Sequence, residues 1–333
     1  MTRPKQRRVW VQAVIGALVT ALLLGALLSL VQWQQLRLLA RGLIWPIVVV
    51  AAALQWVLYL IRALRFWLLT PQVPFREMAA IAALHILALR IFPLRTGELV
   101  YPVLLRRSGE ATLTAGLLGL VVLRLLDAVV IVAFFAVALA LTHGLGGAGV
   151  RHSVVAAAVT AVVGALVVLA FPRLLQLALR LVRASTRIAR LAHRAPIVRL
   201  MQHVEHAVGA HQQISPRVMG QQAAVTVIHW LINYAMILAV LYALQVDIGF
   251  AQAVLGGTAA IVTAFLPIGG IGSFGTLEAG WTLGFVLAGL SKPEAVASGL
   301  VYSLVTFFCA LVFAGLTWIA RPRREVAQPE GTR

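Results

Sequence analysis

Cysteine and charged residues are both scarce in this chain, and each scarcity excludes a class of protein. Cys309 is the single cysteine, so an intrachain disulfide and a cysteine-based metal site are both excluded. Charged residues make up only 11% of the 333 residues, whereas hydrophobic residues make up 61%. A soluble protein needs a far more charged surface than this. The composition therefore indicates a protein that lies largely inside a membrane.

The charges that are present are mostly positive, which gives the chain a formal net charge of +18. They lie in the connections between long apolar runs and not in a basic soluble domain, which argues against nucleic acid as a partner. Basic connections of this kind orient membrane proteins and contact anionic lipids. The apolar runs are continuous and do not alternate with polar residues, so they predict helices and not a transmembrane barrel.

Long apolar runs predict the helices that cross the membrane, since a spanning helix needs about 20 apolar residues. We expect full spans at 9–31, 43–69, 111–141, 153–171, 218–244 and 294–320. Two pairs of shorter apolar segments predict helical hairpins, with arms at 75–92 and 99–105 and at 250–266 and 277–289. The expected fold is all-α and polytopic, a single integral membrane domain over residues 1–333.

The two hairpins share a sequence pattern. In each copy an apolar run ends at a proline, Pro93 or Pro267, which cannot continue the helix. A glycine-bearing turn follows, and its glycines are expected to adopt unusual backbone angles. These residues are Gly97 in the first copy and Gly269, Gly270, Gly272 and Gly275 in the second. Gly270–Gly275 also fits a dinucleotide-binding pattern, but no strand precedes it.

The return arm of each hairpin opens with Thr-x-Glu, at 96–98 and at 276–278. We expect the threonine to cap the helix and the glutamate to lie in its first turn. The repetition extends on both sides and predicts two related halves, at about 43–141 and 218–320.

The placement of arginine predicts the orientation of the chain. The basic N-terminus, the tail after the last span and segment 173–217, which has eight arginines and one acid, are all expected to face the cytoplasm. Six full spans with two re-entrant hairpins inserted from opposite sides, an inverted repeat, satisfy this condition. Eight spans satisfy it equally. Segment 173–217 is expected to form an amphipathic surface helix that either fixes the topology or binds lipid.

Three acids, Glu98, Asp127 and Glu278, fall within the apolar architecture, where an ionised group is costly. Such a group either serves function, here along the path of a lipid headgroup, or has a structural role. For Asp127 the structural role is an ion pair with Arg124, one helical turn earlier. For the two glutamates it is the capping of hairpin helices.

Several arginines gather around the first hairpin. We place Arg95, which lies inside the turn, and Arg124 on the headgroup path, with Arg95 as the expected partner of Glu98. Guanidinium groups and helix N-termini both favour phosphate. The candidate phosphate contacts are Arg62, Arg65, Arg106 and Arg107. The alternative for these four is ordinary snorkelling to the membrane surface.

The sequence has no nucleophile–base constellation and no metal-ligand motif. We therefore predict no catalytic residue, no cofactor and no metal.

Together these motifs resemble a known family. Phe92-Pro-Leu-Arg-Thr-Gly-Glu98, Arg106-Arg107-Ser-Gly109 and Arg124-Leu-Leu-Asp127 are similar to signatures of the lysylphosphatidylglycerol synthase transmembrane, flippase-like family. Leu266-Pro267 and Glu278 resemble its second signature. The resemblance implies a bacterial or archaeal inner-membrane protein that handles polar lipids. The full synthases add an aminoacyl-transferase domain, which we expect this chain to lack as a stand-alone member.

Three functions are consistent with these observations. The first is a flippase that moves a polar phospho- or glycolipid across the membrane through a charged cleft. The second is a membrane enzyme on lipid-linked sugars or phosphates, with one of the three intramembrane acids as acid or base. The third is an accessory partner of a lipid-modifying enzyme in lipid-linked glycan, hopanoid or aminoacyl-lipid synthesis. We favour the non-enzymatic flippase, with membrane lipids as its partners.

Overall fold

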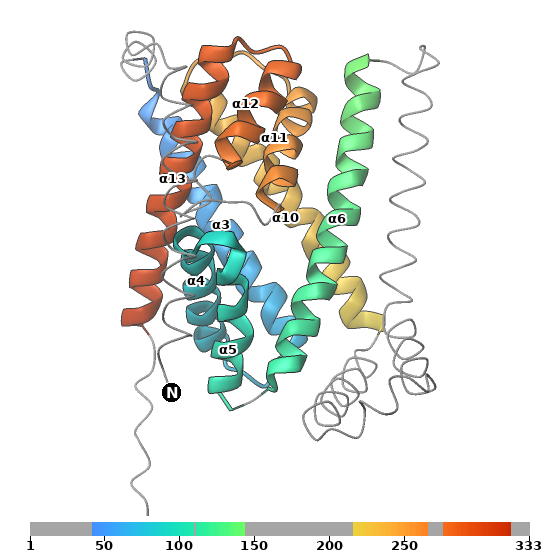
Figure 1. The fold of residues 1–333 in the computed structure, drawn as a ribbon, viewed down its shortest axis with the longest axis vertical. Coiled ribbons are helices and arrows are strands. Elements are labelled where there is room, and N and C mark those ends of the chain that lie inside the picture. The colour runs from blue at the N-terminus through green and yellow to red at the C-terminus, as the bar shows by residue number, and fades with distance from the viewer. Residues whose placement is uncertain (1–41, 110, 144–215, 266–275, 321–333) are drawn as a thin grey trace, which may run out of the picture.

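The computed structural model describes residues 42–109, 111–143, 216–265 and 276–320. Every regular element in these ranges is a helix (Figure 1). Four of them are long and apolar enough to cross a membrane: α3 (Trp45–Leu69), α6 (Leu113–His143), α10 (Pro216–Ala243) and α13 (Lys292–Ile319). The prediction of an all-α polytopic membrane protein is confirmed. The expected spans at 9–31 and 153–171 lie outside the described residues, as does segment 173–217 except its last two residues, which open α10.

The remaining helices form the two predicted hairpins. The first consists of α4 (Phe75–Ile91), the 3-10 helix η1 (Pro93–Leu99) and α5 (Val100–Arg107), and the second of α11 (Phe250–Phe265) and α12 (Thr276–Leu287). With 12 residues, α12 is about 18 Å long, against about 30 Å for the bilayer core. The α5 arm has only 8 residues. These lengths fit re-entrant hairpins and not additional spans.

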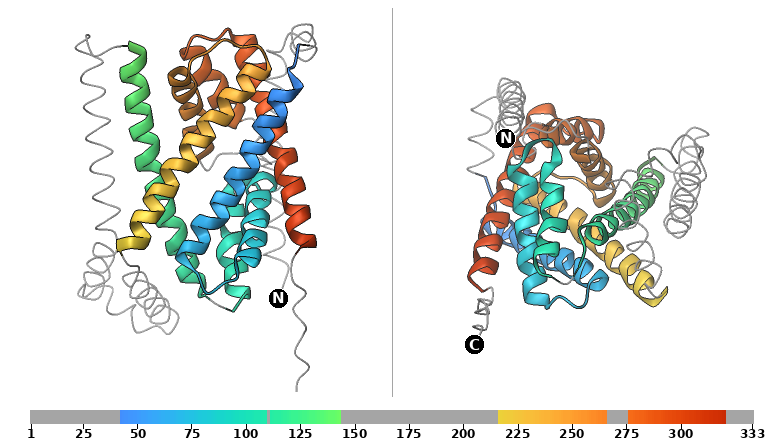
Figure 2. Two further views of the ribbon diagram at one scale, coloured as in Figure 1. Left: turned by 180° about the vertical axis from the view of Figure 1, so that it is seen from behind. Right: turned by 60° about the horizontal axis from the view of Figure 1, so that its bottom comes forward.

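The hairpins enter the bundle from opposite ends. The base of the first lies where α3 ends and α6 begins, and the base of the second lies where α10 ends and α13 begins (Figure 1). Helices α3 and α10 run antiparallel and side by side (Figure 2). The backbone N–H of Ile44 donates to the carbonyl of Ala243 at one end (2.8 Å), and Gln222 Nε2 donates to the carbonyl of Arg65 toward the other (2.6 Å).

Two glycines at equivalent positions support the relation between the halves. Gly109 stands as far beyond Glu98 as Gly289 stands beyond Glu278, and their φ angles are +82° and +106°. This left-handed conformation is costly for other residues and commonly ends a helix. Each hairpin is therefore closed at its base by the same device before the next long helix starts.

The tip of the first hairpin differs from the prediction. Pro93 opens a 3-10 helix that contains Thr96 and Glu98, and α5 is capped at Leu99 without a side-chain bond. Thr96 is therefore not the cap of α5, and Glu98 precedes that helix. The prediction was wrong because a proline at the first helical position favours continued helix, here of the tighter 3-10 kind.

Gly97 also has a different role from the one expected. Its φ is not positive, but a Cβ there would lie 2.5 Å from the carbonyl carbon of Ala88. The glycine is required by the close approach of η1 to α4. In the second hairpin Glu278 lies in the first turn of α12, as predicted, whereas Thr276, expected as the cap, is the first residue of the helix. Pro267 and the glycines at 269–275 lie outside the described residues.

Each hairpin has its own apolar core. Phe66 of α3 stacks on Tyr101 of α5 at 3.9 Å between ring centroids, in a buried cluster with Met78 and Leu105. The second hairpin packs Trp281 and Phe285, which are fully buried, against α10 and α13. These two clusters share no residue, so the hairpins pack into different parts of the bundle.

The opposed hairpins predict the labelling of single cysteines in a Cys309→Ser background. Arg107→Cys reports the base of the first hairpin and Lys292→Cys that of the second, and both positions are exposed. We expect a membrane-impermeant maleimide to reach the two sites from opposite sides of the membrane. Labelling of both from one side contradicts the inverted arrangement.

Candidate functional site

A buried ion pair joins the first half of the chain to α10. Arg65 Nη2 of α3 lies 2.8 Å from Asp127 Oδ1 of α6, with side chains only 4% and 6% exposed. The indole Nε1 of Trp230 on α10 donates to the same oxygen at 2.9 Å. The predicted pair of Arg124 with Asp127 exists as a longer contact of 3.8 Å. The local pair is therefore secondary to bonds between helices.

A second, more exposed pair fixes the tip of the first hairpin to α6. Arg124 Nη2 donates to Glu98 Oε1 at 2.6 Å, with side chains 29% and 22% exposed. His85 of α4 lies behind it, with Nε2 3.7 Å from Glu98 Oε2. Arg124 is thus a partner of Glu98 that the spacing of the sequence did not indicate. The side chain of Arg95, the partner expected from the sequence, lies outside the described residues.

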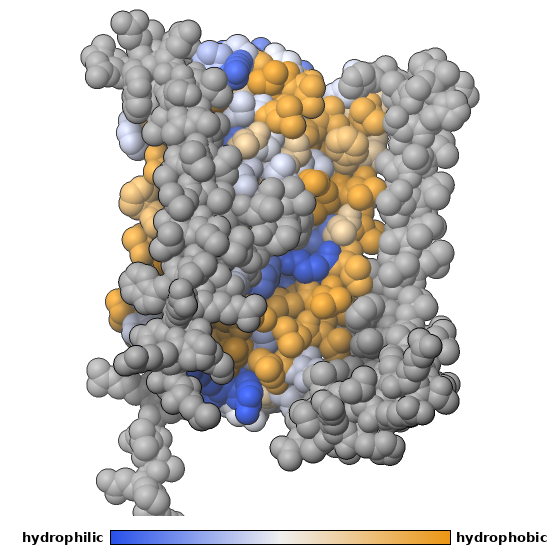
Figure 3. Space-filling model, viewed as in Figure 1, coloured by the Kyte–Doolittle hydropathy of each residue, from blue (hydrophilic) through white to orange (hydrophobic). Residues whose placement is uncertain are grey.

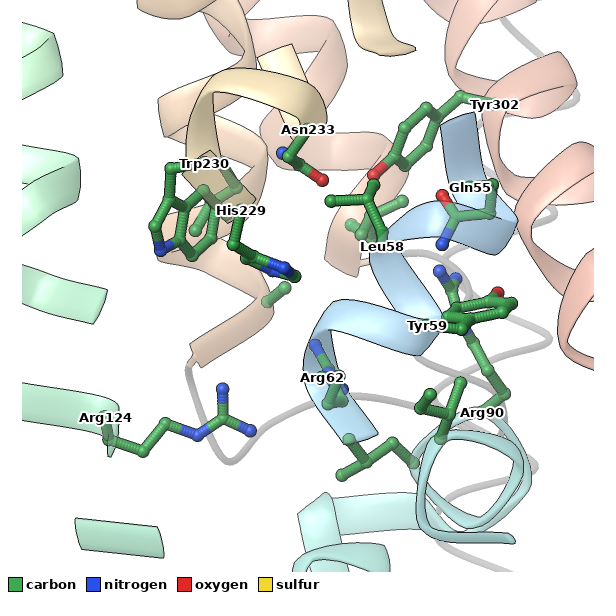
Figure 4. A pocket seen from close by; sticks show the side chains of 15 residues that line it. Gln55, Leu58, Tyr59, Arg62, Arg90, Arg124, His229, Trp230, Asn233 and Tyr302 are labelled. Atoms are coloured by element: carbon green, nitrogen blue, oxygen red, sulfur yellow. The ribbon is translucent and has the colours of Figure 1, made fainter. Parts of the chain in front are cut away.

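A cavity of about 180 Å³ opens where the hairpin tips meet the long helices (Figure 4). Its wall includes Arg90 near the end of α4, Ala264 near the end of α11 and Leu277 near the start of α12. Arg124, which also lines it, is about 17 Å along α6 from the first residue of that helix. The other lining residues, among them Leu58, Asn233 and Tyr302, also stand well inside α3, α10 and α13, so the cavity lies midway along the long helices. Figure 3 shows hydrophilic surface midway along the bundle, bordered by hydrophobic surface.

Several polar side chains of this cavity have no ion pair or hydrogen bond with the described residues. Arg62 and Arg90 make no ion pair with any described residue, and Nδ1 of the buried His229 has no hydrogen bond. The side chains of Gln55, Asn233 and Tyr302 also lack hydrogen-bond partners in the described part of the chain. Unpaired polar groups away from bulk water are costly. The cavity is therefore built to surround something polar.

The residues predicted from the sequence fall into three environments. Arg62 and Arg124 line the cavity, whereas Arg65 and Asp127 form the buried pair beneath it. Arg106 and Arg107 are exposed at the end of α5 and do not line this cavity.

Glu278 lies apart from the other predicted acids. It is buried at 1% exposure, and its Oε1 accepts a hydrogen bond from the hydroxyl of Ser303 on α13. Glu98, by contrast, is partly exposed and is paired to an arginine of the cavity. The two glutamates occupy equivalent places in the repeat but have different surroundings.

Sequence reasoning missed Arg90, His229, Asn233 and Tyr302. Arg90 carried a usable signal, because it is a charge inside the apolar run of a hairpin arm. His229 packs edge-on against Trp230, and its Nδ1 has no hydrogen bond. The neutral residues gave no signal, since Asn and Tyr in long apolar helices are common.

The fold and the cavity define a class: a helical membrane protein in which two opposed helical hairpins meet at a cationic cavity midway along the long helices. Residues 11–314 match the family described as the lysylphosphatidylglycerol synthase TM region, and the chain belongs to this family. The resemblance expected from the motifs is confirmed, and membership indicates a function related to membrane lipids. No curated protein and no solved structure matches the chain significantly.

The buried pair predicts strong coupling between Arg65 and Asp127. Asp127→Asn leaves the Arg65 charge buried without a counter-ion, a loss of about 3–5 kcal/mol for pairs of this kind. We expect Asp127→Asn and Arg65→Gln each to lower the melting temperature in detergent sharply, and the double variant to lower it by much less than the sum.

Arg124→Gln is the matched comparison, because its contact with Asp127 is longer and more exposed. We expect it to cost less than Arg65→Gln. Additive effects of Arg65→Gln and Asp127→Asn contradict the assignment.

Proposed function

We propose that this protein is a lipid flippase that moves a phosphate-bearing polar lipid between the leaflets of the membrane. The observation that carries the proposal is the polar cavity midway along the long helices, where Arg62, Arg90 and Asn233 have no ion-pair or hydrogen-bond partner among the described residues. A headgroup crossing a bilayer loses its hydration, and this cavity offers replacement hydrogen bonds at the costliest point. The acyl tails stay in lipid throughout. Transport of this kind requires no catalytic residue or cofactor.

Arginine is suited to the phosphate of such a headgroup. The guanidinium of Arg62 comes from α3 and that of Arg90 from the hairpin tip, so a bound phosphate joins a long helix to a re-entrant element. Arg124 is shared between the cavity and Glu98. A headgroup phosphate competes with Glu98 for Arg124, which couples occupancy of the cavity to the contact between hairpin and α6. Release of the headgroup needs this competition, because a transported ligand that is bound too tightly cannot leave the site.

The inner membrane of a bacterium is the proposed location, with both termini facing the cytoplasm. This proposal rests on the family and on the basic segments of the sequence. Membrane lipids are the proposed partners. A lipid-modifying enzyme as a further partner would fit the same family, although no contact surface in the described ranges speaks for it.

Reconstitution tests the proposal directly. In vesicles with a fluorescent short-chain phosphatidylglycerol in both leaflets, dithionite bleaches the outer leaflet, and further loss reports lipid that has crossed. We expect the parent protein to accelerate this loss. Arg90→Gln should slow it at least about tenfold, since a hydrogen bond to a charged group contributes about 1.5–3 kcal/mol.

Arg76→Gln is the control for this experiment. Arg76 lies on the same helix α4 but is exposed near its start, away from the cavity. We expect it to retain parental transport. Equal loss in both variants, or a parent no faster than empty vesicles, contradicts the proposal.

The two hairpin glutamates should respond differently to substitution. Glu98→Gln removes the competitor of the phosphate for Arg124, so lipid movement should fall at least about tenfold while the melting temperature stays nearly constant. Glu278→Ala deprives the buried Ser303 hydroxyl of its acceptor, so stability should fall by about 1–3 kcal/mol. Melting curves and the vesicle assay, run on the same preparations, separate the two outcomes. Parental transport by Glu98→Gln would remove Glu98 from the mechanism.

A further inference from the structure

We infer that the cavity selects an anionic headgroup, a phosphate that carries hydroxyl groups, and discriminates against a cationic aminoacylated one. The inference names the ligand class of the site in the proposed function, but it concerns binding and can be tested without transport. It rests on the balance of charge in the cavity wall and on the division of its polar groups between the two halves of the chain.

The charge balance of the site is positive. Arg62, Arg90 and Arg124 line the cavity, and none of the carboxylates in the described ranges does so. Two carboxylates lie close to the cavity, and each already forms an ion pair: Glu98 with Arg124, and Asp127 with Arg65. Arg62 and Arg90 are left without a counter-ion from the described residues. An anionic ligand supplies the charge that the wall lacks, whereas an ammonium group meets like charge where water screens poorly.

The sequence limits where a further carboxylate could come from. The chain has ten acidic residues, and four of them, Glu110, Glu205, Glu325 and Glu330, lie outside the described residues. None of these four falls within an apolar run of the sequence, where a residue must lie to reach the bilayer centre. Glu77, Asp247 and Glu294 stand at or near the ends of described helices, and Glu278 is buried against Ser303. The other acidic residues of the sequence are therefore not placed to neutralise the arginines of the cavity.

The charged groups of the cavity come from one half of the chain. All three arginines come from the first half, on α3, α4 and α6, whereas the second half supplies His229, Asn233 and Tyr302. In Figure 4, Asn233 and Tyr302 lie in the upper part of the cavity and Arg62 and Arg124 in the lower part.

Nδ1 of His229, the Asn233 amide and the Tyr302 hydroxyl have no hydrogen-bond partner among the described residues. Amide, imidazole and phenol groups both donate and accept, as hydroxyl groups do. The pattern fits a headgroup with a phosphate at one end and a hydroxylated group such as glycerol or a sugar at the other.

Equilibrium binding to the detergent-solubilised full chain tests this inference. The probes are phosphatidylglycerol and its lysyl ester with identical acyl chains, compared by native mass spectrometry. We expect phosphatidylglycerol to bind at least about tenfold more tightly. In Arg62→Gln and Arg90→Gln this preference should shrink at least about threefold, while the exposed control Arg76→Gln retains it.

A reciprocal variant strengthens the test. Asn233→Asp places a carboxylate of nearly the same shape in the wall, and it should raise affinity for the lysyl ester relative to phosphatidylglycerol. Equal or tighter binding of the lysyl ester by the parent protein overturns the inference, even if the vesicle assay shows that lipids cross. Selective binding of phosphatidylglycerol without any crossing supports the inference and overturns the flippase proposal, so the two fail separately.

Discussion

The structure depends on how ionised side chains are stabilised inside an apolar bundle. Asp127 is the central case: it accepts from Arg65 of α3 and from the indole of Trp230 on α10, and it is itself on α6. One carboxylate thereby connects three spanning helices. A buried pair contributes little net stability compared with apolar packing, but removing one member leaves a costly charge. The register of these helices is consequently fixed at the level of the cavity, directly beside Arg124 and Arg62.

This constraint explains why the cavity can keep arginines unpaired. With Arg65 neutralised by Asp127, and Arg124 shared with Glu98, the remaining cations, Arg62 and Arg90, face a space near the bilayer centre. An unpaired cation at that depth is expensive and is expected only where a ligand or water replaces the missing contacts. Inverted repeats in transporters place binding sites at the junction of the two halves, and here the halves have diverged, since all three arginines of the cavity come from the first half.

Much of the fold could be predicted from the sequence, because helix boundaries in a membrane are set by length and hydropathy. The predicted ends of α3, α6, α10 and α13 agree with the structure within about two residues. Gly109 and Gly289 stand at equal distances beyond the two hairpin glutamates in the sequence, and both have a positive φ. The tip of the first hairpin was less predictable, since Pro93 and Gly97 fit both an open turn and a 3-10 helix packed closely on α4.

The site was predicted only in part. A charged residue inside an apolar run is a candidate functional residue, and this rule identified Arg124, Asp127 and Glu98. The rule was applied mainly to acidic residues, so it missed Arg90. Which arginine pairs with which acid depends on contacts between helices distant in sequence, so the partners Arg65 for Asp127 and Arg124 for Glu98 were not readable from spacing. His229 and Asn233 enter the site only because α10 lies against α3, which no local pattern encodes.

The most direct test of the central claim is a cryo-electron microscopy structure of the protein in a nanodisc that contains anionic lipid. The account predicts density for a headgroup phosphate within hydrogen-bonding distance of Arg62 and Arg90, with Asn233 or His229 on its other side. A structure in which a protein carboxylate neutralises both arginines, with headgroups only at the membrane surface, would contradict it.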